Sequence, residues 1–171
     1  MRDLRLSAAI IGIVAIAGLA NAPVAKAANA DYVNGGSCQL SIPTTDTKFR
    51  PKASGARNES TDVGNFVICN IQHTESTGLY SEIRLAHYSL DGIARDLTCT
   101  AVVGVLGGST GNNILYSSKT MNTLDPLGAI SWYAPDFGGA SGAAIPQSRY
   151  VSITCNLPPQ TGIKAILGVT N

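Results

Sequence analysis

The sequence of 171 residues contains little charge, two histidines and a single tryptophan. Charged side chains make up 13% of the chain, about half the usual share, and the formal net charge is +1. Because a nucleic-acid binder needs a dense basic surface, we expect no nucleic-acid partner. Hydrophobic residues still make up 44%, which is enough to bury a core. The composition therefore predicts a folded domain rather than a disordered chain.

The chain also lacks the motifs of common catalytic and metal sites. It has no calcium-binding loop, no H-x-x-x-H pair and no phosphate-binding P-loop. A Ser-His-Asp triad would have to use His73 or His87. We expect His87 in the core as a neutral, hydrogen-bonded side chain and His73 in a solvated turn. Residues 139–143 (GASGA) differ from a G-x-S-x-G nucleophile elbow in their last residue. We predict no catalytic residue, no metal and no cofactor.

The first 30 residues have the pattern of a secretory signal peptide. A short basic start precedes an apolar run at 8–20, and small residues follow at the spacing that signal peptidase accepts. The run is too short to span a bilayer as a stable helix. We predict cleavage after Ala30, with Ala27 as the second choice and a retained membrane anchor as the alternative interpretation. Residues 31–171 then form one domain, periplasmic or secreted, without stable membrane insertion.

Four cysteines lie in this domain, at Cys38, Cys69, Cys99 and Cys155. In an oxidising compartment an even number of cysteines predicts structural disulfides. Zinc sites and redox-active pairs usually bring two cysteines within a few residues, and no such pair occurs here. Three connectivities are possible. We favour Cys38–Cys69 together with Cys99–Cys155.

Apolar and polar residues alternate in short runs that turn-forming residues interrupt. This alternation predicts strands at 37–42, 66–71, 79–88, 97–105, 114–121, 127–133, 150–157 and 163–169. The pair Asp91-Gly92 predicts a hairpin turn, and the polar segment 44–62 is expected as the longest loop. No segment has the apolar stripe and caps of a helix. About eight short strands predict an all-β fold, either an antiparallel sandwich or a small barrel.

The alternation also assigns side chains to faces. Along 79–88 it places Leu79 on the face of the apolar residues and Tyr80 on the other. Along 97–105 it continues the inward face to Val105. In the last strand it places four residues on one face, namely Ile163, Ala165, Leu167 and Val169.

Two motifs carry a resemblance. The run 150–159 (YVSITCNLPP), followed by Gly162 and Ile163, and the segment 66–70 (FVICN) resemble small secreted proteins of Gram-negative bacteria with no assigned function. The resemblance also includes the order of the cysteines. It implies a secreted, disulfide-linked β domain and no catalytic residue. A pilin-type subunit is similar in size, secretion and β content but differs in its cysteine positions and final strands.

Trp132, Tyr133 and Asp136 form a candidate ligand-binding cluster. They lie at the start of a glycine-rich stretch that extends to residue 146. If Leu127 and Tyr133 face inward, Trp132 faces solvent, where it can stack on a sugar ring or dock a partner. The alternative is that Trp132 packs in the core, as a lone tryptophan in a sandwich usually does.

A second candidate is the basic group formed by Lys48, Arg50, Lys52 and Arg57. Such a group can contact an anionic surface, for example lipopolysaccharide or a polyanionic glycan. Because no aromatic residues are interleaved with these cations, we favour a solvated loop.

These observations favour a secreted, non-enzymatic protein that is structural or binds a partner at the cell envelope. The partners we consider are an envelope glycan and another secreted protein. Two alternatives remain open: an envelope glycan-binding module that uses Trp132, and a small extracellular hydrolase that uses His73 or His87.

Overall fold

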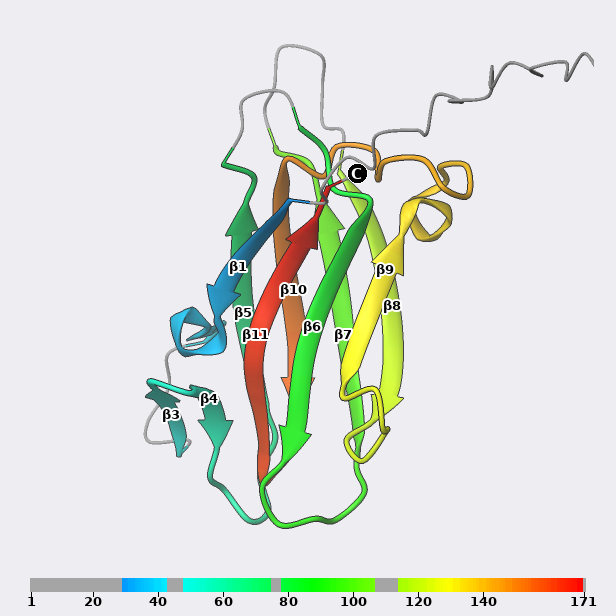
Figure 1. Cartoon of the computed structure of the whole chain (residues 1–171). Coiled ribbons are helices and arrows are strands. Elements are labelled where there is room, and N and C mark those ends of the chain that lie inside the picture. The colour runs from blue at the N-terminus through cyan, green and yellow to red at the C-terminus, as the bar shows by residue number, and fades with distance from the viewer. Residues whose placement is uncertain (1–28, 43–47, 75–77, 107–113, 171) are drawn as a thin grey trace, which may run out of the picture.

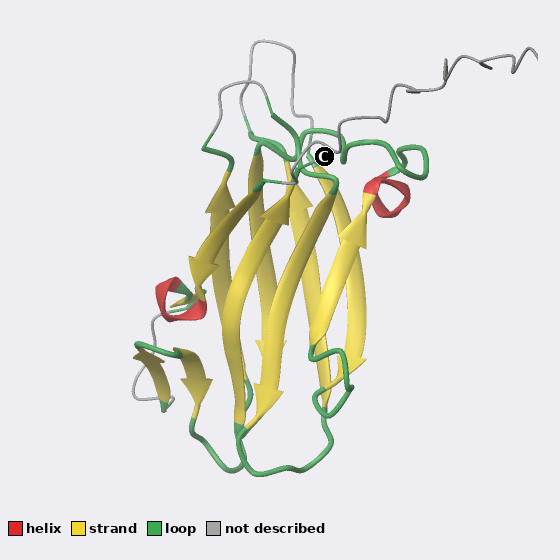
Figure 2. Ribbon diagram, viewed as in Figure 1, coloured by secondary structure: helices red, strands yellow, loops and turns green. Residues whose placement is uncertain are grey.

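Two antiparallel sheets face each other as a β-sandwich (Figures 1 and 2). The structure is a computed structural model that describes residues 29–42, 48–74, 78–106 and 114–170. These residues contain 11 strands, two short 3-10 helices and no α-helix. The predicted antiparallel β-sandwich is confirmed, and the small-barrel alternative is wrong because the sheets stay separate.

The first sheet, called sheet A, has the strand order β3-β4-β11-β6-β9, with β1 also paired to β11. Its strands are β1 (Ala30–Asn34), β3 (Phe49–Lys52), β4 (Gly55–Asn58), β6 (Glu82–Ser89), β9 (Ala129–Tyr133) and β11 (Thr161–Val169). Two strands share one edge of β11. β4 pairs with its first residues, as far as Ile163, and β1 pairs with the residues from Ala165 onward.

The second sheet, called sheet B, has the order β2-β5-β10-β7-β8. Its strands are β2 (Gln39–Leu40), β5 (Asn65–Gln72), β7 (Asp96–Val103), β8 (Leu115–Asn122) and β10 (Tyr150–Leu157). The 3-10 helix η1 (Gly35–Ser37) precedes β2, and η2 (Ala134–Phe137) follows β9. The strands predicted at 66–71, 114–121 and 150–157 are confirmed within one residue.

Both disulfides lie in the core between the sheets. The structure joins Cys38 to Cys69 and Cys99 to Cys155 and leaves no cysteine free, which confirms the favoured connectivity. Cys99 and Cys155 are direct partners on the paired strands β7 and β10. All four side chains are buried, so the crosslinks are enclosed within the packed interior.

The segment 44–62 is not a loop, and this prediction is wrong for its described part, which forms the paired strands β3 and β4. Alternation failed because the inward positions of β4 are small or polar. Ala56 and Asn58 are fully buried, and the Asn58 amide donates to the carbonyls of Val63, Leu157 and Pro158 at 2.8–3.0 Å. Asn58 can be buried because its amide is hydrogen-bonded to these carbonyls. A polar residue at an inward position breaks the apolar alternation from which a strand is predicted.

Three of the predicted face assignments are wrong, two because of where the strands begin or end and one because of a β-bulge. β6 begins at Glu82, so Tyr80 lies outside the alternation and is fully buried, whereas Leu79 is exposed. β7 ends at Val103, so Val105 is exposed. In β11 a β-bulge falls between Ile163 and Ala165 and reverses the alternation beyond it. As a result Ile163, Ala165 and Ile166 are buried, whereas Leu167 and Val169 are only half-buried.

The predicted Asp91-Gly92 turn exists, and Gly92 has the positive φ (71°) that such a turn requires. It does not close a hairpin, however. The chain passes here from β6 in sheet A to β7 in sheet B, so the turn connects the two layers of the sandwich. Residues 107–108 (GG) and 111–113 (GNN), whose composition predicts turns, lie outside the described residues.

Candidate functional site

Trp132 lies in the core, and the hypothesis that it faces solvent is wrong. Its side chain on β9 is fully buried, and its indole Nε1 donates to the Ser117 carbonyl of β8 at 3.1 Å. The condition of that hypothesis, an inward orientation of Leu127 and Tyr133, is not met, because both side chains are exposed. The alternative of a core tryptophan is confirmed, so its ring is not available to stack on a sugar.

Asp136 and Lys119 connect the two sheets at one open side of the sandwich. The Asp136 carboxylate accepts from Lys119 Nζ at 2.7 Å and from the Tyr133 backbone N–H at 2.8 Å. Lys119 Nζ also donates to the Ser131 carbonyl at 2.8 Å. Lys119 belongs to the edge strand β8, and Ser131 belongs to the edge strand β9. An inward-pointing charge such as Lys119 on an edge strand also discourages pairing with other chains. Because Asp136 is bound to Lys119 and Trp132 is buried, we interpret the Trp132–Tyr133–Asp136 cluster as structural.

The two histidines are both buried. His87 on β6 faces the core, and burial lowers its pKa, with a weaker opposing effect from Asp125. His73 was expected to be solvated, which is wrong. Its ring stacks on Tyr80 with centroids 4.8 Å apart, and its Nδ1 is 3.6 Å from Asp31 Oδ2.

Asp31 accepts hydrogen bonds from the hydroxyls of Tyr80 and Thr74, each at 2.8 Å. Burial alone would raise the pKa of Asp31, but these hydrogen bonds outweigh it and lower that pKa. For Tyr80, burial and the hydrogen bond to Asp31 both raise the pKa. Both hydroxyl protons therefore point to the carboxylate and not to His73. This arrangement ties β1 to the chain on either side of the turn at His73 and does not form a nucleophilic triad.

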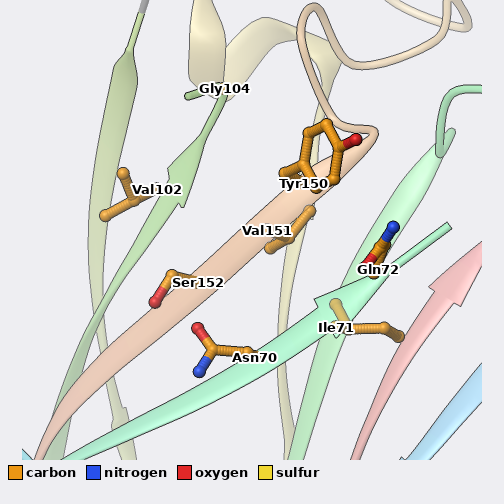
Figure 3. A pocket seen from close by; sticks show the side chains of 8 residues that line it. All are labelled: Asn70, Ile71, Gln72, Val102, Gly104, Tyr150, Val151 and Ser152. Carbon is orange, nitrogen blue, oxygen red and sulfur yellow. The ribbon is translucent and has the colours of Figure 1, made fainter. Parts of the chain in front are cut away.

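A cleft of about 390 Å³ lies on the outer face of sheet B, and we call it the Tyr150 cleft (Figure 3). It is lined by Asn70, Ile71, Gln72, Val102, Gly104, Tyr150, Val151 and Ser152. The register of β10 with β5 pairs Tyr150 with Gln72 and Ser152 with Asn70. These four side chains share the outward face because inward residues alternate with them along both strands.

The Tyr150 ring stands at the end of β10, and its side chain is 39% exposed. Gly104 lies opposite, where its N–H donates to the Tyr150 carbonyl at 3.2 Å. Gly104 has a φ of 101°, a conformation that glycine adopts without strain. The absence of a side chain there keeps that side of the cleft open.

The polar groups of the Tyr150 cleft are unoccupied by the protein itself. Within the described ranges, no side-chain hydrogen bond engages the amides of Asn70 and Gln72 or the hydroxyl of Ser152. By contrast, further along the same face Thr98 pairs with Thr120 and Thr100 pairs with Ser118, at 2.8 and 2.7 Å. The cleft therefore offers free donors and acceptors beside an aromatic ring.

No lining residue of this cleft is charged. Arg149 does not line the cleft, but its guanidinium carbon lies 5.8 Å from the Tyr150 ring centroid. The outward residues between this cleft and the far end of the sheet are also uncharged, and the exposed Asp96 at the start of β7 is the exception. The uncharged ones are Phe66, Ile68, Thr98, Thr100, Tyr116, Ser118, Thr120, Thr154 and Asn156. The site therefore favours a neutral ligand.

Sequence reasoning did not identify the Tyr150 cleft. Asn70 and Gln72 lie far from Tyr150 in sequence, and only the pairing of β5 with β10 brings them together.

In the part of the chain that the structure describes, no three potential metal ligands gather. A search of the same residues finds no helix with the length and apolarity to cross a membrane.

Comparison with protein-family models, with curated proteins and with solved structures finds no match for this chain.

Proposed function

We propose that this protein is a secreted, non-enzymatic binding protein of the cell envelope or extracellular space, and that the Tyr150 cleft binds a neutral saccharide. The observation that carries this proposal is the exposed Tyr150 ring beside three uncommitted polar side chains, Asn70, Gln72 and Ser152, with no charge among the lining residues. It replaces the Trp132 site of the sequence analysis.

The chemistry of a pyranose fits this arrangement. A sugar ring has apolar C–H faces, which pack on an aromatic ring, and hydroxyl groups that both donate and accept hydrogen bonds. Each carboxamide offers one acceptor and two donors, so Asn70 and Gln72 can satisfy neighbouring hydroxyls at once. A cleft of about 390 Å³ is within the size range of small-molecule sites.

The sharpest test is a calorimetric titration with neutral oligosaccharides of glucose, galactose, mannose and N-acetylglucosamine. We expect one of them to bind, and Tyr150→Ala to weaken that binding by roughly 2- to 10-fold, because an aromatic contact contributes about 0.5–1.5 kcal/mol. The matched control is Phe66→Ala, which removes an exposed aromatic from the opposite end of the same face. Absence of binding across the panel, or equal loss in both variants, would contradict the proposal.

Export is part of the same proposal. Two buried disulfides support folding in an oxidising compartment, and the resemblance to small secreted proteins of Gram-negative bacteria stays a prediction. For the cleavage site we now favour Ala27 over Ala30. The Asn29 carbonyl accepts from the N–H and the hydroxyl of Thr170 at 2.8 and 3.1 Å, and Ala30 pairs with Val169.

Cleavage after Ala30 would remove these contacts at the end of β11, whereas cleavage after Ala27 retains them. The intact mass of the exported protein decides between the two. A mature chain that begins at Ala28 is expected, and one that begins at Asp31 would reject this choice. A chain that retains residues 1–27 would favour the alternative of a retained membrane anchor.

A further inference from the structure

The outer face of sheet A carries a second cleft, of about 440 Å³, which we call the Tyr88 cleft. It is lined by Tyr32, Asn34, Ser54, Arg57, Tyr88 and Lys164. These residues come from β1, the β3–β4 turn, β4, β6 and β11, which lie side by side in sheet A (Figure 1). The cleft lies on the opposite side of the sandwich from the Tyr150 cleft.

A glycine beneath the Tyr88 ring leaves room for this ring to lie against the sheet. Gly162 of β11 is the register partner of both Arg57 on β4 and Tyr88 on β6, so the three residues form one row across the sheet. A Cβ atom at Gly162 would overlap the Tyr88 ring. The ring therefore lies against β11 over Gly162.

Two cations converge on this ring. The β-bulge between Ile163 and Ala165 accommodates the exposed Lys164, whose Nζ is 5.6 Å from the Tyr88 ring centroid. From the other side, Arg57 Nε donates to the Tyr88 hydroxyl oxygen at 2.9 Å. Since that oxygen accepts from Arg57, its own proton remains available to donate to a ligand.

Neither cation is neutralised by a carboxylate. Within the described residues, no ion pair involves Arg57 or Lys164, and no lining residue is acidic. Arg57 instead contacts the neutral hydroxyls of Tyr88 and Ser54. On the same strand as Tyr88, Arg84 is paired with Glu82 at 2.7 Å. Two uncompensated cations in one cleft raise the local concentration of anions.

We propose that the Tyr88 cleft binds a carboxylate-bearing sugar, namely a uronic acid residue of an acidic glycan. Arg57 and Lys164 bind the carboxylate through charge-assisted hydrogen bonds. The rings of Tyr88 and of Tyr32, whose side chain is 64% exposed, pack on the C–H faces of the saccharide. The Asn34 side chain already binds Gly36 N and the Ala53 carbonyl, so it shapes the wall of the cleft.

The balance of charge and aromatic surface selects this ligand class. Two cations match a repeating unit with one carboxylate, whereas nucleic-acid binding requires many more phosphate contacts. A bare inorganic anion would leave the tyrosine rings unused. Of the basic group in the sequence analysis, Arg57 alone lines this cleft, and the aromatic side chains that it meets come from β1 and β6 and not from its own segment.

The test compares oligogalacturonate with a galactose oligomer of equal length and with inorganic phosphate, each titrated into the full chain by calorimetry. We expect binding of oligogalacturonate, weaker binding at higher salt, and no comparable binding of the other two. Arg57→Gln and Lys164→Gln should each weaken binding roughly tenfold or more, the effect of losing a charge-assisted bond. Tyr88→Phe, which loses only the hydroxyl that positions Arg57, should cause a smaller loss.

Arg84→Gln is the matched control, because it removes one positive charge from the same face of β6 outside the cleft, and it should leave the affinity within about twofold. Circular dichroism confirms that each variant is folded. Equal binding of phosphate would show a general anion site and overturn the saccharide assignment, as would absence of oligogalacturonate binding or equal effects of Arg84→Gln and Arg57→Gln. The Tyr150→Ala variant should bind oligogalacturonate normally, so failure here and failure of the neutral-saccharide proposal are distinguishable.

Discussion

The two outer faces of the sandwich differ in regularity and in charge. Sheet B has continuous pairing along β5, β10, β7 and β8, and its outward rows carry hydroxyls, amides and a few aromatic rings. Sheet A is interrupted by a β-bulge, and two strands share one edge of β11. The same two-residue alternation thus produces a face whose strands carry a single outward charge, Asp96, where the pairing is regular, and a basic, aromatic face where it is interrupted.

Sheet B also holds the crosslinks, whereas sheet A depends on packing. Each disulfide has a partner in β5 or β10, and none lies within sheet A. Sheet A instead relies on close contacts such as Tyr88 on Gly162 and on the hydrogen bonds of Asp31 to Tyr80 and Thr74. We therefore expect the largest losses of stability when sheet B loses a crosslink.

Removal of the Cys99–Cys155 disulfide should have the largest effect. In the Cys99→Ala, Cys155→Ala double variant, the free energy of unfolding should fall by about 4 kcal/mol, because the unfolded chain loses a loop constraint of 56 residues. Urea denaturation under non-reducing conditions measures this. The equivalent removal of Cys38–Cys69, with a separation of 31 residues, should cost slightly less. A change below about 1 kcal/mol would show that β7 and β10 are held by pairing alone.

Gly162→Ala tests the packing on which sheet A depends. The new methyl group would overlap the Tyr88 ring, so we expect a loss of about 1–3 kcal/mol from overpacking. In a Tyr88→Ala background the same substitution should cost much less, because the obstructing ring is absent. A double-mutant cycle from denaturation midpoints measures the coupling. Additive effects would show that Gly162 is required for another reason.

His87 should make the stability of the sandwich depend on pH. Burial lowers its pKa in the folded state below the ordinary value of 6.5, so the unfolded chain binds a proton more readily. Stability is then fully present above pH 6.5 and falls as the pH decreases below it, with a slope of up to about 1.4 kcal/mol per pH unit. Thermal unfolding of the wild type and of His87→Leu between pH 7 and about pH 5 tests this. Parallel curves would rule out His87 as the cause.

Loss of the Lys119–Asp136 ion pair between the sheets should have the smallest effect on stability. Lys119→Met breaks a half-exposed ion pair with Asp136, so the free energy of unfolding should change by about 1 kcal/mol or less. Hydrogen exchange at the backbone amides of β8 and β9 should nevertheless increase, because the two edge strands lose a direct connection. Unchanged exchange in both strands would show that Trp132 alone holds this side closed.

The strands with apolar alternation were predictable from local pattern, and those with polar interiors were not. Residues 150–157 alternate without exception and appear as β10. The hairpin of β3 and β4 was missed because its inward Asn58 is satisfied by carbonyls from other segments. Trp132 illustrates the same limit: a shift of one residue in β9 reverses the face of every side chain, and only the pairing with β6 fixes it.

The sequence by itself determined that the chain is all-β and which strands alternate most clearly, because these properties follow from local periodicity. It left three disulfide connectivities open, and the fold decided between them by placing Cys99 opposite Cys155 on paired strands. The tertiary structure alone decided where Trp132 points and which side chains meet in the two clefts. Arg57, Tyr88 and Lys164 come from three strands, and their contact depends on strand order and on one bulge in β11. Strand order arises from the burial of the whole core, and no single segment encodes it.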